Sequence, residues 1–108
     1  MKMITAIVSK KDAPFVCDSL REGGFAFTKM ASTGGFLRAG NITLLIGVED
    51  ERVSDALELI RLHSAKRMEP APPLMGEGGK PLSLPSQAQV PVGGATVFVT
   101  DIVHFEKL

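Results

Sequence analysis

Glycines, polar side chains and one phenylalanine gather in residues 30–41, between two apolar runs. Gly34 and Gly35 let the backbone take positive φ and let a ligand approach it closely. Arg38 offers a planar fork of donors, and Asn41 carries a donor and an acceptor on one short side chain. Such residue types can hold a ligand. The alternative is a glycine-rich surface connection with an exposed arginine.

The length of this connection favours a functional role. Residues 32–41 exceed the roughly two to five residues that a β-hairpin turn needs. Longer loops in compact domains are more often functional than short ones. We therefore predict that residues 32–41 form a short glycine-rich binding loop.

No group of residues has the spacing of a catalytic or metal site. His63 is expected to be solvated or hydrogen-bonded on a helix flank, and His104 to be a partly buried structural residue. Cys17 falls on an apolar helical stripe, where a free thiol behaves as a small hydrophobe. We expect no enzyme, no metal and no cofactor, because catalysis needs a positioned acid, base, nucleophile or metal.

Length and charge bound the class of protein. The chain has 108 residues, twelve basic and twelve acidic residues, and one cysteine. That length predicts one small domain, and a net charge of zero gives no global attraction to polymeric nucleic acid or to a membrane. With no signal peptide and no long apolar run, we expect a cytoplasmic protein.

Apolar periodicity predicts four strands and two helices. The strands are expected at residues 2–9, 26–31, 42–48 and 95–100. One helix is expected to begin after Asp12, which can cap it, and to end at about Glu22. The other begins at Glu49 or Asp50 and ends at residues 65–67, with a buried stripe of Val53, Ala56, Leu57, Ile60 and Ser64.

A change of composition marks the segment before the last strand. Residues 68–92 hold most of the prolines and several glycines, so a regular helix is excluded and the strand signal is poor. We predict a long mobile flap, and the alternative is a disordered surface insertion without a ligand role. Residues 102–108 are expected to form a short edge strand or a tail packed on a neighbour.

The order strand, helix, strand, strand, helix, strand is the split βαβ arrangement. It predicts an α+β, ferredoxin-like βαββαβ fold, with a four-stranded antiparallel sheet and both helices on one face. Three of the strands are apolar on both parities, so the second face of the sheet should also be buried. Self-association is the simplest way to cover it.

Specific sequence blocks resemble one known family, the PII-like cyclic di-AMP receptors of bacteria. The matching segments are residues 1–4 and 6–8, residues 28–29, the block TGGFLRAGN at 33–41, residues 47–48 and 52–53, and the block VGGATVFV at 92–99. The resemblance spans the whole chain, which implies a single PII-like domain over residues 1–108. It also implies a homotrimer with ligand pockets in the clefts between adjacent subunits.

The same resemblance implies a set of ligand residues. Carried over by position, the pocket is lined by Thr28, Gly35, Phe36, Leu37, Asn41, Gly47 and Phe98. Backbone amides around residues 35–37 can hold a phosphate, and Phe36 and Phe98 can lie against adenine rings. Arg38 pairs either with a phosphate or with a carboxylate of a neighbouring subunit.

One short segment departs from the family pattern. Members of the family carry Asn-Phe-Arg where this chain has residues 24–26, Gly-Phe-Ala, and that asparagine and arginine contact the nucleotide. Loss of such an arginine weakens anion binding by about 1.5–3 kcal/mol, roughly one to two decades of affinity. Replacement charges are available elsewhere in the chain, and the sequence does not choose among them: Lys29, Arg67, Lys80 and Lys107.

The resemblance implies a non-enzymatic signal-transduction protein that binds cyclic di-AMP and relays it to an unidentified partner protein through loop reordering. The alternative, raised by Gly24 and Ala26, is a PII-like trimeric interaction module. Such a module senses another adenine nucleotide (ATP, ADP or AMP) or none. A small nucleotide-acting enzyme is a third hypothesis, but no catalytic group is assembled for it.

Overall fold

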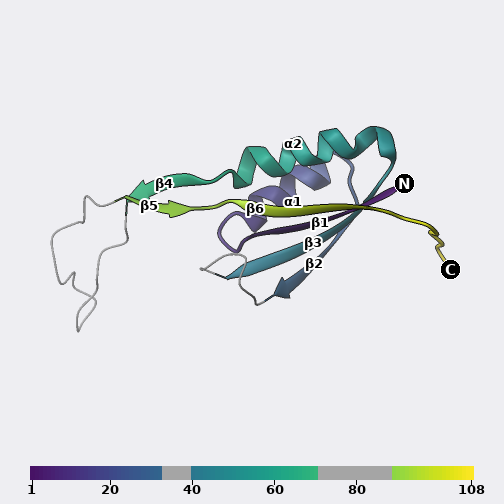
Figure 1. Ribbon diagram of the computed structural model, residues 1–108, viewed down its shortest axis with the longest axis horizontal. Coiled ribbons are helices and arrows are strands. Elements are labelled where there is room, and N and C mark those ends of the chain that lie inside the picture. The colour runs from purple at the N-terminus through teal and green to yellow at the C-terminus, as the bar shows by residue number, and fades with distance from the viewer. Residues whose placement is uncertain (33–39, 71–88) are drawn as a thin grey trace.

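The computed structural model describes residues 1–32, 40–70 and 89–108, which form two layers and a short two-stranded extension (Figure 1). In chain order the elements are β1 (Lys2–Ser9), α1 (Ala13–Glu22), β2 (Phe27–Ser32), β3 (Asn41–Val48), the 3₁₀ turn η1 (Asp50–Arg52), α2 (Val53–Ser64), β4 (Arg67–Pro70), β5 (Gln89–Val92) and β6 (Ala95–Asp101). The predicted order of strands and helices is confirmed for the two-layered body.

The main sheet has the strand order β2-β3-β1-β6, and each neighbouring pair is antiparallel. The N-terminal strand β1 therefore lies inside the sheet, between β3 and β6. Its register places Thr5 opposite both Leu45 of β3 and Phe98 of β6. An antiparallel sheet with two helices in this order is compatible with the predicted ferredoxin-like fold.

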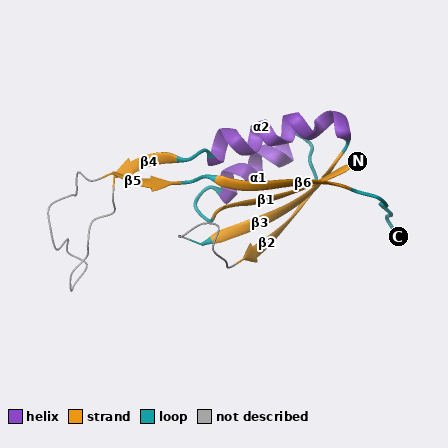
Figure 2. Cartoon of the chain, viewed as in Figure 1, coloured by secondary structure: helices purple, strands orange, loops and turns teal. Residues whose placement is uncertain are grey.

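Both helices cover the same face of the main sheet (Figure 2). Alternate side chains of the inner strands point into the space beneath them, where Ile4 and Leu44 are completely buried. Val16 and Leu20 of α1 and Ile60 of α2 close this core from the helix side. The opposite face of the sheet carries no helix within the described residues.

The predicted helical stripes are confirmed. The buried residues are Ala13, Val16, Cys17 and Leu20 in α1 and Ala56, Ile60 and Ser64 in α2, with Val53 and Leu57 packed against them. His63 forms the hydrogen bond expected of a flank residue, 2.6 Å from its Nε2 to Ser19 Oγ. Because these contacts join the helices to each other, the helix layer is fixed over the sheet.

Asp12 stands at the start of α1 but does not cap it with its side chain, contrary to the prediction. Its carboxylate is instead held by Arg67, and its backbone N–H donates to Ser9 Oγ at 3.2 Å. A charge-assisted bond to a guanidinium competes successfully with a neutral backbone cap.

After α1, Gly24 takes φ 79°, a left-handed conformation that glycine adopts readily, and turns the chain into β2.

The second helix starts later than predicted. Residues after Glu49 first form the 3₁₀ turn η1, and α2 begins at Val53 and ends at Ser64. Such 3₁₀ turns are frequent at the ends of α-helices. The turn places Arg52 close to Gly23 and Phe25, which precede β2.

The strand signal of residues 68–92 is poor, yet both ends of the predicted flap form strands. β4 and β5 pair antiparallel, with Arg67 opposite Val92 and Pro70 opposite Gln89. Proline lacks an N–H, but a strand with a free edge tolerates it, and both strands of a two-stranded ribbon are edges. Residues 71–88, the rest of the predicted flap, lie outside the described residues.

Residues 102–108 form no strand, so the first alternative, an edge strand, was wrong, and a tail packed on a neighbour stays a prediction. Ile102 N–H donates to Met1 O at 3.1 Å, and the chain then continues without regular structure. His104 was expected to be partly buried, but its side chain is exposed and lies 3.3 Å from Glu106. Val103 and Phe105 are exposed as well.

Candidate functional site

The helix-free face of the main sheet, called the open face below, carries the described residues that were predicted to bind ligand. Directly paired residues of an antiparallel ladder share a face. The register therefore assigns to the open face Met3, Thr5 and Ile7 of β1, Thr28 and Met30 of β2, Thr43, Leu45 and Gly47 of β3, and Thr96, Phe98 and Thr100 of β6. Hydroxyls and apolar side chains are thus mixed on this surface.

Thr28 and Phe98 lie in one row across the open face, at opposite edges of the sheet. The row runs from Thr28 through Leu45 and Thr5 to Phe98. With strands about 4.8 Å apart, three spacings separate its ends by about 14 Å. Phe98 is 47% exposed and Thr28 is also exposed. Within one chain, Thr28 and Phe98 therefore lie on the same face but are too far apart to contact each other.

Asn41 begins β3 at the end of the sheet next to the glycine-rich connection. It is 3% exposed, and its Oδ1 is buried without a hydrogen-bond donor from the described residues. An unsatisfied buried oxygen costs about 1–3 kcal/mol. Thr28 pairs opposite Leu45, further along β3, so Asn41 and Thr28 are also about 14 Å apart. A donor on a ligand would satisfy the Asn41 oxygen.

Gly47 borders a cavity of about 210 Å³ at the other end of β3. The same cavity is lined by Gly24 and Ala26, where the family pattern has asparagine and arginine. Because glycine and alanine lack polar side chains, these two positions contribute no side-chain hydrogen bond. Glu49 and Arg52 supply the charged side chains of the lining, and the N-terminal ammonium of Met1, another lining residue, is paired with Asp50 at 2.7 Å.

Arg52 is a charged residue of this cavity that the sequence analysis did not single out. Its Cζ lies 4.0 Å from the centroid of the Phe25 ring, and its Nη2 donates to Gly23 O at 2.9 Å. The ion pairs of the described residues leave Arg52 without a carboxylate partner. Its presence in a segment that matches the family was the available signal, but only the fold brings η1 against the start of β2.

The predicted replacement cations do not gather at the open face. Lys29 pairs opposite Leu44, so it belongs to the helix-covered face. Arg67 is bound to two carboxylates, and Lys107 lies in the exposed C-terminal segment. Lys80 lies outside the described residues.

Four of the predicted ligand residues belong to the glycine-rich connection itself. Gly35, Phe36, Leu37 and Arg38 lie outside the described residues. Their roles stay predictions, as does the choice between a phosphate and a carboxylate partner for Arg38. The predicted ligand residues that the structure describes are therefore Thr28, Asn41, Gly47 and Phe98, and Arg52 shares a cavity with Gly47.

An ion cluster joins the β4–β5 ribbon to the body. Arg67 Nη2 and Nη1 donate to the Asp12 carboxylate at 2.8 and 3.3 Å, and Arg67 Nε donates to Glu69 Oε1 at 3.1 Å. Lys11 Nζ lies 2.5 Å from the other Glu69 oxygen. Burial would raise the pKa of Asp12, but hydrogen bonds from Arg67 and Ser9 outweigh it and lower that pKa. This cluster holds the ribbon in place.

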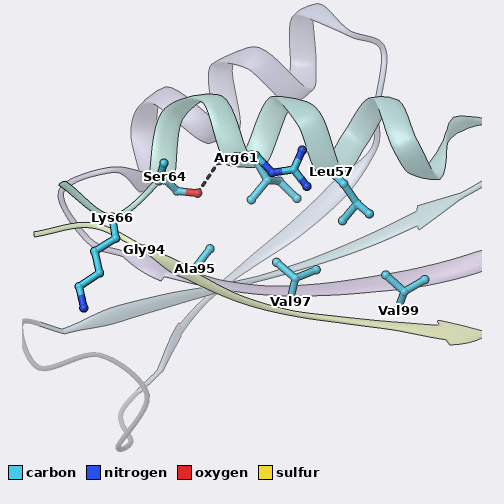
Figure 3. A pocket seen from close by; sticks show the side chains of 10 residues that line it. Leu57, Arg61, Ser64, Lys66, Gly94, Ala95, Val97 and Val99 are labelled. Carbon is cyan, nitrogen blue, oxygen red and sulfur yellow. Dashed lines mark hydrogen bonds between the residues drawn. The ribbon is translucent and has the colours of Figure 1, made fainter.

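A larger cavity, about 580 Å³, lies between α2 and β6. Figure 3 shows Leu57, Val97 and Val99 pointing into it, with Arg61 and Lys66 among its lining residues. Val97 and Val99 alternate with Phe98, so the cavity lies on the helix side of the sheet. None of the four predicted ligand residues that the structure describes lines it.

The described residues hold no group of three or more histidine, cysteine, aspartate or glutamate side chains able to bind a metal ion. Within the same ranges, no helix is long and apolar enough to cross a membrane. Cys17 is buried in the core, and burial raises the pKa of its thiol.

The fold thus defines a small mixed α/β protein with an antiparallel sheet, two helices on one face and an open face on the other. The family model of the cyclic-di-AMP receptor matches residues 1–108, and the chain belongs to that family. The chain is also similar to a crystal structure described as a functionally unknown protein from Pediococcus pentosaceus. The two share 39% sequence identity and a TM-score of 0.80, over 99% of this chain and 96% of that chain. The family predicted from the sequence blocks is confirmed.

Proposed function

We propose that this receptor is a trimeric, non-enzymatic signal-transduction protein that binds cyclic di-AMP at subunit interfaces. Binding reorders the glycine-rich connection and the segment after β4, and a partner protein reads that change in the cytoplasm. The observation that carries this proposal is the placement of Thr28 and Phe98 at opposite edges of one open face.

The two-edge placement favours a site made by two copies. Thr28 and Phe98 are about 14 Å apart within a chain, so one base does not contact both in the same subunit. When the β6 edge of one copy approaches the β2 edge of the next, Phe98 and Thr28 lie on the two sides of one cleft. Burial of Leu45 and Met30 of the open face would stabilise this assembly through the hydrophobic effect.

The spread of polar groups along the open face favours a ligand with two bases. Asn41 and Gly47 lie at opposite ends of β3, about 20 Å apart along the strand. A dinucleotide can place one base near Thr28 and Gly47 and the other near Asn41. The buried Asn41 Oδ1 would then accept a hydrogen bond from the amino group of an adenine.

A second candidate function rests on the cavity beside Gly47. Gly24 and Ala26 leave that cavity without the two side chains that contact nucleotide elsewhere in the family. The absence of these two side chains is consistent with a trimeric interaction module. Such a module would sense ATP, ADP, AMP or no nucleotide. In either case we propose a receptor rather than an enzyme.

Calorimetric titration tests the proposal directly. We expect heat of binding with cyclic di-AMP and weaker or no binding with ATP, ADP and AMP. Phe98→Ala should weaken cyclic di-AMP binding by about tenfold or more, because a stacked base contributes about 1–3 kcal/mol. Phe15→Ala is the matched control, since Phe15 is 61% exposed on α1 at the helix side.

The outcomes separate the two candidates. Heat with a mononucleotide and none with cyclic di-AMP supports the second function and rejects the first. Equal affinities of the Phe98→Ala and Phe15→Ala proteins would show that the open face is not the binding surface.

A further inference from the structure

We propose that Arg52 is a ligand-binding residue of this receptor, whose guanidinium binds a phosphate of the cyclic dinucleotide in the cavity beside Gly47. In this proposal Arg52 supplies the positive charge that the family's arginine would supply at the position of Ala26. The inference rests on the proposed function and names the cation of that same site. Neither the family match nor the sequence blocks assign such a role to Arg52.

The first support is position. Arg52 lines the cavity of about 210 Å³ together with Gly24, Ala26 and Gly47. A Cβ added at Gly24 would lie 3.9 Å from Arg52 Nη1, and no other atom would be closer. The guanidinium therefore borders the space that opens where this chain has glycine and the family has asparagine.

The second support is the state of the guanidinium. Stacking on the Phe25 ring fixes the plane of the Arg52 guanidinium, and the hydrogen bond from Nη2 to Gly23 O fixes its orientation within that plane. It has no carboxylate partner among the described residues, whereas Arg21 and Arg61 are each paired with one carboxylate and Arg67 with two. A fixed fork with donors to spare suits an anion with two oxygens, such as a phosphodiester.

Glu49 carries a negative charge, which would repel a phosphate bound beside Arg52. It lines the same cavity, and its backbone carbonyl accepts the Arg52 N–H at 2.9 Å. Its side chain is exposed and forms no ion pair with Arg52 in the described residues. The carboxylate can therefore remain in water while the guanidinium binds the anion.

Two of the other candidate cations lie elsewhere in the described part of the chain. Lys29 lies on the helix-covered face, and Arg67 is engaged by Asp12 and Glu69. Among the described residues, Arg52 is the basic side chain that shares a cavity with both departing positions and with Gly47. The N-terminal ammonium of Met1, which also lines this cavity, is paired with Asp50 at 2.7 Å.

The test compares two stacked arginines by calorimetric titration of the full chain with cyclic di-AMP. Arg52→Gln keeps a donor for Gly23 O but removes the charge, and we expect affinity to fall about tenfold to a hundredfold. Arg21→Gln is the control, because Arg21 also lies over a phenylalanine, with Cζ 5.3 Å from the Phe27 ring. We expect its affinity to stay within about twofold of the wild type, and the double variant Arg52→Gln/Ala26→Arg to recover binding.

The outcomes distinguish this inference from the proposed function. Wild-type protein that binds no cyclic di-AMP overturns both. Wild-type binding that Arg52→Gln leaves unchanged overturns the role of Arg52 alone. If Arg52→Gln does not fold, NMR on the wild type decides: the Nε–Hε resonance of Arg52 should shift with cyclic di-AMP while that of Arg21 stays. An unmoved Arg52 resonance rejects the inference.

Discussion

Asp12 and Arg67 are separated by 55 positions in the chain, yet the guanidinium holds the buried carboxylate with two hydrogen bonds of 2.8 and 3.3 Å. The Asp12 side chain is 3% exposed and that of Arg67 is 37% exposed. This pair connects the start of α1 to the base of the β4–β5 ribbon. It therefore couples the helix layer to the β4–β5 ribbon.

Removal of one partner of this pair should destabilise the fold. Arg67→Met leaves the Asp12 carboxylate buried without a counter-charge, and we expect a loss of about 2–3 kcal/mol in the free energy of unfolding. That estimate lies below the range for fully buried pairs because Arg67 is partly solvated. Urea unfolding measures it, with Arg61→Met, an exposed pair on α2, as the control. Equal losses in the two variants would contradict the role of burial.

The same pair predicts a pH dependence. Hydrogen bonds lower the pKa of Asp12 below its ordinary value of 3.8, so its contribution to stability is complete above about pH 4. The contribution is lost as the pH falls through the folded-state pKa, because the unfolded chain takes up the proton first. Thermal unfolding between about pH 2 and pH 7 should show a steeper acid loss in wild type than in Asp12→Asn. Parallel curves would show that Asp12 does not provide this linkage.

Adjacent glycines provide a sharp test of the packing around the ion cluster. Gly93 and Gly94 have φ of 78° and 95°, so alanine strains the backbone at both. A Cβ at Gly93 would also lie 2.6 Å from Arg67 Nη1 and 3.1 Å from Asp12 Oδ2, whereas the nearest atom to one at Gly94 is 4.0 Å away. Gly93→Ala should therefore lower stability by about 1–2 kcal/mol more than Gly94→Ala.

Cys17 should behave as an inert thiol in the folded protein. Burial raises its pKa, and Cys17 is 2% exposed, so little reactive thiolate is present at neutral pH. A disulfide reagent should label Cys17 slowly under native conditions and rapidly in guanidinium chloride. Fast native labelling would show that the core around α1 opens readily.

The open face should control the oligomeric state. Leu45 lies near its centre, between Thr5 and Thr28, so Leu45→Lys places a charge in the proposed interface. Light scattering should give a trimer for wild type and a smaller mass for this variant. Leu62→Lys, at a site 70% exposed on α2, should leave the mass unchanged. A monomeric wild-type protein would remove the proposed assembly.

The sequence predicted the body of the fold well because burial leaves a strong periodic signal. The stripes of α1 and α2 and the apolar runs of β1 and β3 follow directly from which residues avoid water. Pairing of β4 with β5 was missed, because Pro70 and Pro91 weaken the strand signal and the ribbon buries no apolar stripe. Its anchor, Arg67 on Asp12, depends on a contact between distant segments.

The candidate site could be predicted in part, because several of its residues belong to strands that the sequence blocks mark. Thr28, Asn41, Gly47 and Phe98 were placed by their sequence blocks, and the strand register then brought all four to one side of the sheet. Arg52 was not selected, because its neighbours Gly23 and Phe25 belong to another segment. Local patterns say little about a cation whose surroundings are assembled only by the tertiary fold.

The location of β1 between β3 and β6 has a consequence for synthesis on the ribosome. Strand β1 acquires its second neighbour only when Ala95–Asp101 has left the exit tunnel. Until then one side of β1 has unpaired backbone groups, which are open to pairing with other nascent chains. The four-stranded sheet of this receptor is therefore completed only after β6 has been synthesised, and we expect a product truncated before residue 95 to be prone to aggregation.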